Sequence, residues 1–168
     1  ANIDVEKMDD KELFGLRHSY NLKIDGQITR AKVIEKLFGE LCESKLIQPT
    51  FLIHHPMEIS PLAKPHRDNP EIAERFEPFI NGWEVGNCYS ELTDPILQRK
   101  FFENQELERV EGDEEAHPMD EDYIQALEYG LCPNAGIGIG IDRMVMLLTD
   151  SKTIRDVILF PMVKPDPT

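Results

Sequence analysis

The residue pair Asn81 and Gly82 constrains the fold of this chain more than any other feature. It separates two stretches, RFEPFI at 75–80 and WEVGNCYSEL at 83–92, that are rich in residues typical of strands. Asn-Gly is a strong signal for a two-residue hairpin, because both central positions of a type I′ turn need a positive φ. The sequence therefore predicts two antiparallel strands with a defined register. The predicted pairs are Ile80 with Trp83, Phe79 with Glu84, and Glu77 with Gly86.

Acidic residues occupy positions in this hairpin where an ordinary strand would carry valines. In the predicted register Glu77 and Glu84 are diagonal neighbours on one face. Two like charges so placed repel unless a cation lies between them or water screens both. Oxygen ligands of this kind suit Mg²⁺ or Mn²⁺, which bind through one or two carboxylates together with substrate phosphates. The alternative is a solvated strand face that holds no ligand.

The polar residues Asn87, Tyr89 and Glu91 differ in parity from Glu84 and would point to the opposite face of a regular strand. Gly86 has no Cβ and is suited to a β-bulge, a feature often found beside active sites. We therefore predict a bulge at this glycine that rotates the three polar residues to the side of the carboxylates. A regular ladder through residues 84–88 would contradict this prediction.

The run GIGIGIDR at 136–143 is a second unusual pattern. Its glycines alternate strictly and fit neither a dinucleotide fingerprint nor a P-loop. As a strand it would present one face without side chains, against which a flat ligand could lie, while its isoleucines pack into the core. Arg143 would emerge in the first turn of a following helix, where a guanidinium can stack on a base and neutralise phosphate. Alternatively, the glycines permit close helix packing and Arg143 pairs with Asp142 or Asp150.

The other segments show helical and strand patterns without a regular βαβ rhythm. Helices are predicted within 1–20, from the N-cap Thr29 to 44, over 95–110 after the N-cap Asp94, over 121–129, and from 141 onward. Strands are predicted over 51–55 and 153–161, with a long loop at 58–74. This order indicates an α+β fold, a mainly antiparallel sheet flanked by helices.

Composition limits the range of functions. With 168 residues, 40% hydrophobic and 30% charged, the chain is expected to form one globular domain. A net charge of −14 argues against sequence-independent binding of nucleic acid, so such a partner would be held mainly by residues outside this chain. No apolar run has membrane-spanning length and the stretch ANIDVEKMDDKELFG is acidic, which favours a cytoplasmic protein without a membrane partner. The widely spaced Cys42, Cys88 and Cys132 predict reduced, mostly buried thiols.

Taken together, these motifs resemble a known family. GIGIGIDR, followed by an apolar helix and ILFP, is similar to motif 3 of the class II aminoacyl-tRNA synthetases. ERFEPFINGWEVGNCYSELTDPILQ, ALEYGLCPNAGIGIGIDRMVMLLTDSKTIRDVILFP and KLIQPTFLIHHPMEISPLAK resemble the C-terminal catalytic part of the lysyl-tRNA synthetases. The aspartyl and asparaginyl relatives have no match to NCYSELTDP. The ligase that attaches β-lysine to an elongation factor shares a version of this segment and is therefore a closer alternative than the aspartyl and asparaginyl relatives. The resemblance is close from about Glu35 to Pro165. We therefore expect two parts in the chain: a helical and loop lead-in segment over 1–28, and a C-terminal part of the catalytic domain over 29–168.

The resemblance implies metal-binding and lysine-binding residues in the hairpin. Glu77 and Glu84 would hold Mg²⁺ near the phosphates of ATP. Asn87, Tyr89 and Glu91 would bind the substrate lysine, with Glu91 meeting its ammonium group and Tyr89 forming a wall of the pocket.

The resemblance also implies an ATP-binding site that includes the glycine run. Arg143 would be the catalytic residue and would lie over adenine near the phosphates. The ATP-binding residues implied in this way are Glu77, Glu84, Gly136, Gly138, Gly140 and Arg143.

Some parts of such an enzyme have no counterpart in this sequence. Motif 1, which forms the homodimer, motif 2, whose arginine binds the α-phosphate, and the anticodon-binding domain are not recognisable. The resemblance therefore implies an incomplete catalytic core from an enzyme that activates lysine with ATP and transfers it to tRNA(Lys), and we expect the isolated chain to be a poor catalyst. The alternatives are a non-catalytic module that binds lysine, nucleotide or a protein, and an acidic scaffold without any ligand.

Overall fold

The structure is a computed structural model that describes residues 4–5, 7–113 and 116–162. Its helices are α1 (Asp10–Ser19), α2 (Arg30–Leu41), α3 (Pro95–Val110), α4 (Glu121–Glu128) and α5 (Ile141–Thr149). Its strands are β1 (Thr50–Ile53), β2 (Arg75–Ile80), β3 (Trp83–Glu84), β4 (Gly86–Ser90) and β5 (Ala135–Ile139). Short 3₁₀ turns are η1 (Glu43–Lys45), η2 (Met57–Ile59) and η3 (Ile154–Asp156). No helix within the described ranges is long and apolar enough to cross a bilayer.

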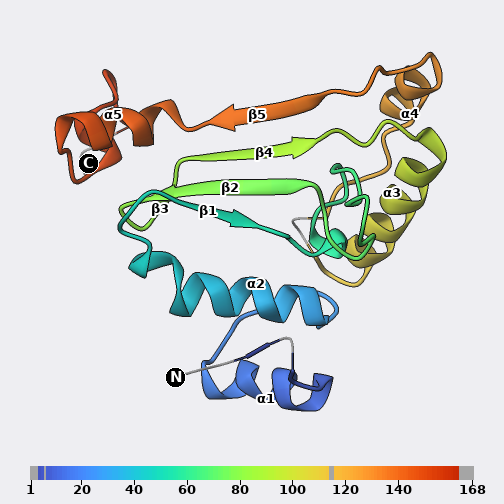
Figure 1. Ribbon diagram of the computed structural model, residues 1–168, viewed down its shortest axis with the longest axis horizontal. Helices are drawn as coiled ribbons and strands as arrows, with labels where there is room; N and C mark the ends of the chain where they lie inside the picture. The colour runs from blue at the N-terminus through green and yellow to red at the C-terminus, as the bar shows by residue number, and fades with distance from the viewer. Residues whose placement is uncertain (1–3, 6, 114–115, 163–168) are drawn as a thin grey trace, which may run out of the picture.

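The strands form one antiparallel sheet in the order β1-β2-β4-β5, with the short β3 pairing with β2. Figure 1 shows α2 along one side of this sheet, with α1 beyond it. Helices α3 and α4 lie at one end of the strands, and α5 lies at the other end. The predicted α+β fold with a mainly antiparallel sheet and flanking helices is confirmed.

Side-chain caps mark where helices α1 to α4 begin. Asp9 and Glu12 form a capping box at the start of α1, in which each carboxylate accepts the other residue's backbone N–H. Asp94 accepts two backbone N–H groups from the first turn of α3, so this helix covers the predicted range. Helix α2 begins after the predicted cap Thr29 but ends at Leu41, before the predicted end, because the chain tightens there into η1.

Helix α2 connects the N-terminal layer to the rest of the fold. The buried residues between α1 and α2 are Leu13, Leu22, Val33 and Leu37. On its other side Phe38 packs edge-on against Phe79 of β2, with ring centroids 5.6 Å apart. Lys32 forms ion pairs with Glu108 of α3 and with Asp113 in the following loop. These contacts hold α2 against both the sheet and α3.

The hairpin between β2 and β3 has the predicted turn. Asn81 and Gly82 have positive φ values of 57° and 73°, as a type I′ turn requires. Ile80 pairs with Trp83. Phe79 pairs with Glu84, so the register predicted at the turn is confirmed.

The register changes beyond β3. Arg75 pairs with Tyr89, which is one residue out of step with the pairs at the turn. The inserted residue is Val85, whose N–H donates to the carbonyl of Pro78 at 2.9 Å. The predicted bulge is therefore confirmed, with its extra residue directly before Gly86. The predicted pairing of Glu77 with Gly86 is wrong, because the bulge moves the register by one residue and brings Asn87 opposite Glu77.

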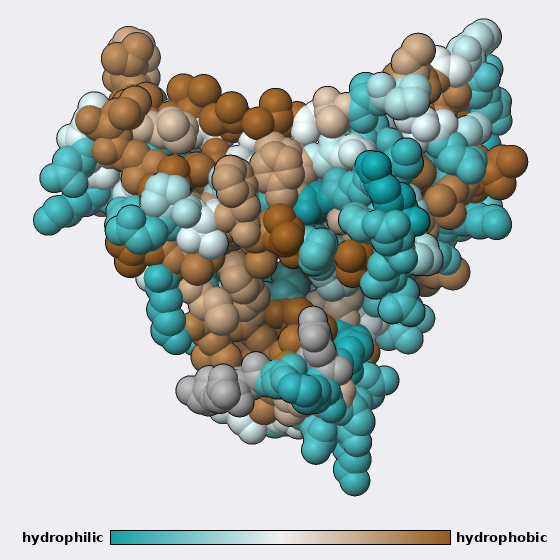
Figure 2. Space-filling view, in the orientation of Figure 1, coloured by the Kyte–Doolittle hydropathy of each residue, from teal (hydrophilic) through white to brown (hydrophobic). Residues whose placement is uncertain are grey.

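The face of β5 that carries isoleucines is open. Ile137 and Ile139 are 66% and 52% exposed, so the prediction that they pack into the core is wrong. The same face of the sheet carries Phe51, Ile53 and Phe76, which are also exposed. Because the described part of the chain supplies no layer that buries these residues, apolar surface remains along β5, and it continues onto α5 (Figure 2).

Two other sequence predictions are wrong. The segment 153–161 forms the turn η3 and no strand, because the Thr153 hydroxyl bonds to Asp156 within the turn and no neighbouring strand pairs with the segment among the described residues. The three cysteines are free as predicted, but Cys42 and Cys132 are exposed and only Cys88 is buried.

Candidate functional site

One face of the sheet carries the polar residues of the hairpin. Because of the bulge, Asn87 and Tyr89 of β4 share this face with Glu84, opposite Glu77 and Arg75 of β2. The Nδ2 atom of Asn87 lies 3.4 Å from Oε1 of Glu77 across the strand pair. The bulge thus brings together side chains whose sequence parity would otherwise separate them.

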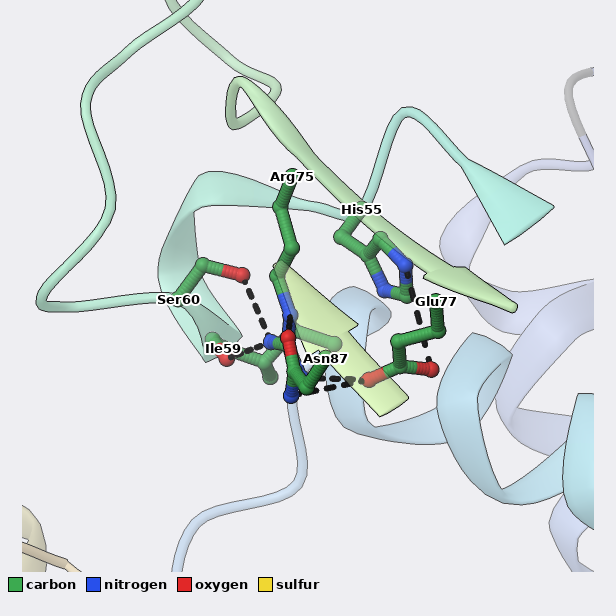
Figure 3. A network of polar contacts seen from close by, with 6 residues as sticks. All are labelled: His55, Ile59, Ser60, Arg75, Glu77 and Asn87. Atoms are coloured by element: carbon green, nitrogen blue, oxygen red, sulfur yellow. Dashed lines mark hydrogen bonds and ion pairs between the residues drawn. The ribbon is translucent and has the colours of Figure 1, made fainter. Parts of the chain in front are cut away.

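Arg75, at the start of β2, lies at the centre of this face (Figure 3). Its Nε donates to Oδ1 of Asn87 at 3.1 Å, and its Nη2 donates to Oε1 of Glu77 at 2.5 Å. Its Nη1 donates to the carbonyl of Ile59 at 3.2 Å and to the Ser60 hydroxyl at 3.0 Å. The Arg75 side chain is 17% exposed, so its ion pair with Glu77 is largely shielded from water.

His55 faces the second carboxylate oxygen of Glu77. Its Nε2 lies 3.8 Å from Oε2 and has no hydrogen-bond partner among the described residues. Burial and the charge of Arg75 lower the pKa of His55 to about 4, so the imidazole is neutral near pH 7. A neutral imidazole at this distance leaves the lone pairs of Oε2 available to another ligand.

Glu84 and Arg143 lie together at one end of the site. Arg143, in the first turn of α5, donates to the backbone carbonyl of Glu84. Gly140, the N-cap of this helix, donates its N–H to the carbonyl of Val85 at 3.0 Å, which joins the helix to the bulge. Burial and the charge of Glu77 raise the pKa of Glu84, although Arg143 opposes this effect. A carboxylate whose charged form is disfavoured in this way gains from a nearby cation.

The glycines of β5 form a bare ledge beside these residues. Gly136 pairs with Tyr89 and Gly138 pairs with Asn87, so both glycines face the polar side of the sheet. A Cβ at Gly136 would lie 2.5 Å from Oε1 of Glu91, so this carboxylate lies directly on the strand. A Cβ at Gly138 would come no closer than 3.8 Å to the Asn87 carbonyl, which leaves open space above that glycine.

Glu91 opens onto a cavity of about 560 Å³ between the sheet and helices α3 and α4. Tyr89, Phe102 and Tyr123 line this cavity. Burial raises the pKa of Glu91, and burial together with the charge of Glu91 raises the pKa values of both tyrosines. Asp120 also lines this aromatic cavity, but its side chain caps α4 by accepting the backbone N–H of Tyr123, so Glu91 is the carboxylate of the cavity that does not cap a helix.

A second cavity, of about 250 Å³, adjoins the first one. Leu62, Tyr89 and His117 line both cavities, and the second cavity extends to Arg75 and Asn87. The site therefore runs along the sheet from a carboxylate in an aromatic pocket to an arginine. This arrangement suits a ligand with a cationic group at one end and an anionic group at the other.

The family described as tRNA synthetases class II (D, K and N) matches residues 5–164. The chain belongs to this family.

The most similar relatives in this class II synthetase family include several proteins named lysine-tRNA ligase. One from Moorella thermoacetica is 56% identical over 147 residues, which are 88% of this chain and 30% of that protein. One from Saccharolobus solfataricus is 54% identical over 162 residues, 95% of this chain and 33% of that protein. One from Christiangramia forsetii is 45% identical over 166 residues, 99% of this chain and 29% of that protein. The chain thus spans about a third of the length of these relatives.

The carboxylates of this class II synthetase chain fit a divalent cation that is held partly by phosphate. No group of three or more His, Cys, Asp or Glu side chains in the described ranges is arranged as a metal site by itself. Glu84 has a raised pKa beside Glu77, and Oε2 of Glu77 is not hydrogen-bonded to His55. Mg²⁺ usually binds through one or two carboxylates and keeps water or phosphate in its other positions. The pair Glu77 and Glu84 has this chemistry.

Several residues of the site were not predicted from the sequence. Arg75 could have been found, because it precedes Glu77 by two residues in a strand and must share its face. His55 lies outside the strands, and its position depends on a hydrogen bond from the N–H of Ala73 to its carbonyl, at 2.8 Å. Tyr123 comes from α4, and no local sequence pattern indicates that this helix reaches Glu91.

Proposed function

We propose that this chain forms the part of a lysine-tRNA ligase that binds L-lysine and Mg-ATP during lysyl-adenylate formation. The observation that carries this proposal is the bulge at Val85, which places Glu84, Asn87 and Tyr89 on one sheet face beside the glycines of β5. The names of the similar proteins support lysine as the amino acid. Transfer of the lysyl group to tRNA(Lys) would follow in the complete enzyme.

In this proposal the aromatic cavity holds the side chain of lysine. Partial burial raises the pKa of Glu91, so a lysine ammonium beside it would supply the missing counter-charge. Amino acids that are shorter or neutral would leave this carboxylate unpaired, which is costly in a buried site. Tyr89 and Tyr123 would enclose the methylene chain of lysine, and Asn87 would contact its polar backbone atoms.

The nucleotide would lie at the other end of the site. Gly136, Gly138 and Gly140 would form its floor, and Arg143 would lie over adenine and close to the phosphates. Mg²⁺ held by Glu77 and Glu84, when bound, would neutralise phosphate charge.

The proposed reaction needs the lysine carboxylate and the α-phosphorus of ATP to be held in contact. The carboxylate oxygen bonds to phosphorus while pyrophosphate leaves, and a ribose hydroxyl of tRNA later displaces AMP from the adenylate. The residues of this chain would act by orienting both substrates and by neutralising charge.

We propose further that tRNA contacts are made mainly outside this chain, since its net charge of −14 opposes binding to a polyanion. A homodimer and a cytoplasmic location, where charged tRNA is consumed, are proposed for the complete enzyme because the chain belongs to the class II tRNA synthetase family. Size measurements on the complete protein and imaging of a fluorescent fusion would test these two points.

Calorimetric titration of the 168-residue polypeptide with L-lysine and with Mg-ATP tests the proposal. We expect binding of L-lysine that E91Q weakens by about tenfold or more, because the ammonium loses its charged partner. The matched control is E103Q, since Glu103 is an exposed carboxylate on α3. Equal binding of L-lysine by wild type and E91Q would contradict the assigned role of Glu91.

Exchange of labelled pyrophosphate into ATP separates a binding module from a catalyst. We expect the polypeptide to show no lysine-dependent exchange, because no arginine corresponding to that of motif 2 is recognisable in its sequence. Robust exchange would show that this arginine is not required. Absence of binding to both ligands would remove the proposed function from this chain.

A further inference from the structure

The Arg75 side chain forms hydrogen bonds with residues from both ends of the site and with a neighbouring segment of the fold. Two of its hydrogen bonds go to groups of the proposed site, Glu77 and Asn87. Two others go to the η2 segment, to the carbonyl of its last residue, Ile59, and to the hydroxyl of the next residue, Ser60. Figure 3 shows these partners around one planar group, with contributions from β2, β4 and the η2 segment.

The partners in the η2 segment are themselves held in place. Ser60 is 4% exposed, and its backbone N–H donates to the carbonyl of Met57 at 3.0 Å. Met57 in turn donates its N–H to the carbonyl of Glu71 at 2.8 Å. Arg75 is therefore attached to a fixed part of the fold as well as to the two site residues.

The bond from Arg75 determines which way the amide of Asn87 points. Because Oδ1 accepts from Nε of Arg75, the Nδ2 group faces Oε1 of Glu77 at 3.4 Å. An amide nitrogen carries two hydrogens, so one N–H remains for an acceptor in the adjoining cavity. A carboxylate or phosphate oxygen is such an acceptor, whereas an ammonium group is not.

Arg75 also supplies the positive charge closest to Glu77. His55, on the other side of this carboxylate, is buried and neutral. The other charged group known to act on the pair from a neighbouring strand is Glu84, which repels Glu77. Without Arg75, Glu77 would lose its ion-pair partner while the like charge of Glu84 remained, so Glu77 would lose its present position.

We propose that Arg75 is a positioning residue that fixes Glu77 for the metal and nucleotide and orients the Asn87 amide for the amino acid, so that one side chain couples the two halves of the site. This inference rests on the proposed function for the identity of the ligands. The geometry of the coupling does not depend on it. Arginine suits this role because its planar group presents several donors in fixed directions, which lysine cannot reproduce.

Binding titrations of R75Q and R75K test the coupling. We expect R75Q to weaken binding of both L-lysine and Mg-ATP by about tenfold or more, because it removes hydrogen bonds from a charged donor to both groups. R75K keeps the positive charge beside Glu77 but loses the planar set of donors that orients the Asn87 amide. It is therefore expected to restore Mg-ATP binding more fully than lysine binding. The matched control is R67Q, since Arg67 is 77% exposed and pairs with Glu74 at 3.0 Å, and it is expected to change neither affinity.

A second readout is independent of ligands. The side-chain amide signals of Asn87, identified by their loss in N87D, are expected to be protected from hydrogen exchange in wild type and R67Q. We expect them to exchange about tenfold faster or more in R75Q and R75K. If R75Q does not fold, R75K alone provides both readouts.

These results separate the two proposals. If wild type binds neither ligand, the proposed function fails, and the amide exchange alone decides the role of Arg75. Unchanged Asn87 exchange in R75K and R75Q would overturn the positioning role. If both ligands bind and R75Q weakens the binding of only one of them, the coupling is overturned even if the proposed function stands.

Discussion

At the scale of single residues, the buried His55 makes stability depend on pH. Its pKa is about 4 in the folded chain because burial and the charge of Arg75 disfavour the imidazolium, whereas the ordinary value is 6.5. The unfolded chain therefore binds a proton at this residue below about pH 6.5, and the folded chain does not until about pH 4. Since the unfolded state binds more protons, the free energy of unfolding falls as the pH falls through this window.

We expect this single group to cost about 2 kcal/mol of stability between about pH 7 and pH 5. Urea denaturation at several pH values should show that H55Q lacks this part of the loss, because glutamine does not titrate. Carboxylates titrate in both proteins, so the difference between the two curves isolates His55. The control is H54N, because His54 is exposed and has a φ of 63°, a conformation that asparagine tolerates. Parallel curves for wild type and H55Q would contradict the assigned cause.

At the scale of elements, the contact between β4 and β5 depends on a glycine. A Cβ at Gly86 would lie 2.8 Å from the backbone carbonyl oxygen of Gly138 and 3.4 Å from Pro78. The backbone oxygen cannot move away without disturbing the pairing of the two strands. Gly86 directly follows the bulge residue Val85 and pairs with Ile139 of β5, so a side chain here would disturb the site as well as the sheet.

We expect G86A to lower the free energy of unfolding by about 1 to 3 kcal/mol, the usual cost of an overpacked position. Hydrogen exchange of the β5 amides should become faster at the same time. The control is G15A in α1, where an added Cβ meets no atom within 4 Å. There, alanine should be neutral or stabilising by up to about 1 kcal/mol, because it is the better helix former. If G86A were as stable as G15A in urea denaturation, the close approach of the strands would not matter.

Elements whose cause is local could be predicted from the sequence. The turn at Asn81, the caps at Thr29 and Asp94, and the bulge before Gly86 follow from residues only a few positions apart. The candidate site follows in part from the same local features, because the bulge decides which hairpin side chains share a face.

Predictions that depended on distant partners were less successful. The segment 153–161 has strand-like composition but pairs with no strand among the described residues, and the isoleucines of β5 have no layer to cover them. Arg75 and His55 belong to the site through contacts that join separate elements. The register at the turn, in contrast, predicted the position of Glu84 correctly.

At the scale of the whole molecule, an open apolar face and a large net charge act in opposite directions. Phe51, Ile53, Phe76, Ile137 and Ile139 form a contiguous exposed surface on the side of the sheet away from the polar site. Exposed apolar patches of this kind bind hydrophobic dyes and favour association. The net charge of −14 makes copies of the chain repel one another, and this repulsion weakens in salt.

We therefore expect the native polypeptide to bind the dye ANS and to self-associate increasingly as the salt concentration is raised from about 0.05 M to 0.5 M, because the Debye length shortens to a few Å. The double variant I137T/I139T should reduce both effects, since it interrupts the apolar surface without touching the glycines. The control is I96T, because Ile96 is 70% exposed on α3 and away from this face. Sedimentation velocity and dye fluorescence measure the two effects. If the double variant behaved like I96T in both, the open face of the sheet would not be the surface responsible. If association decreased with added salt, electrostatic attraction would be the cause in place of apolar contact.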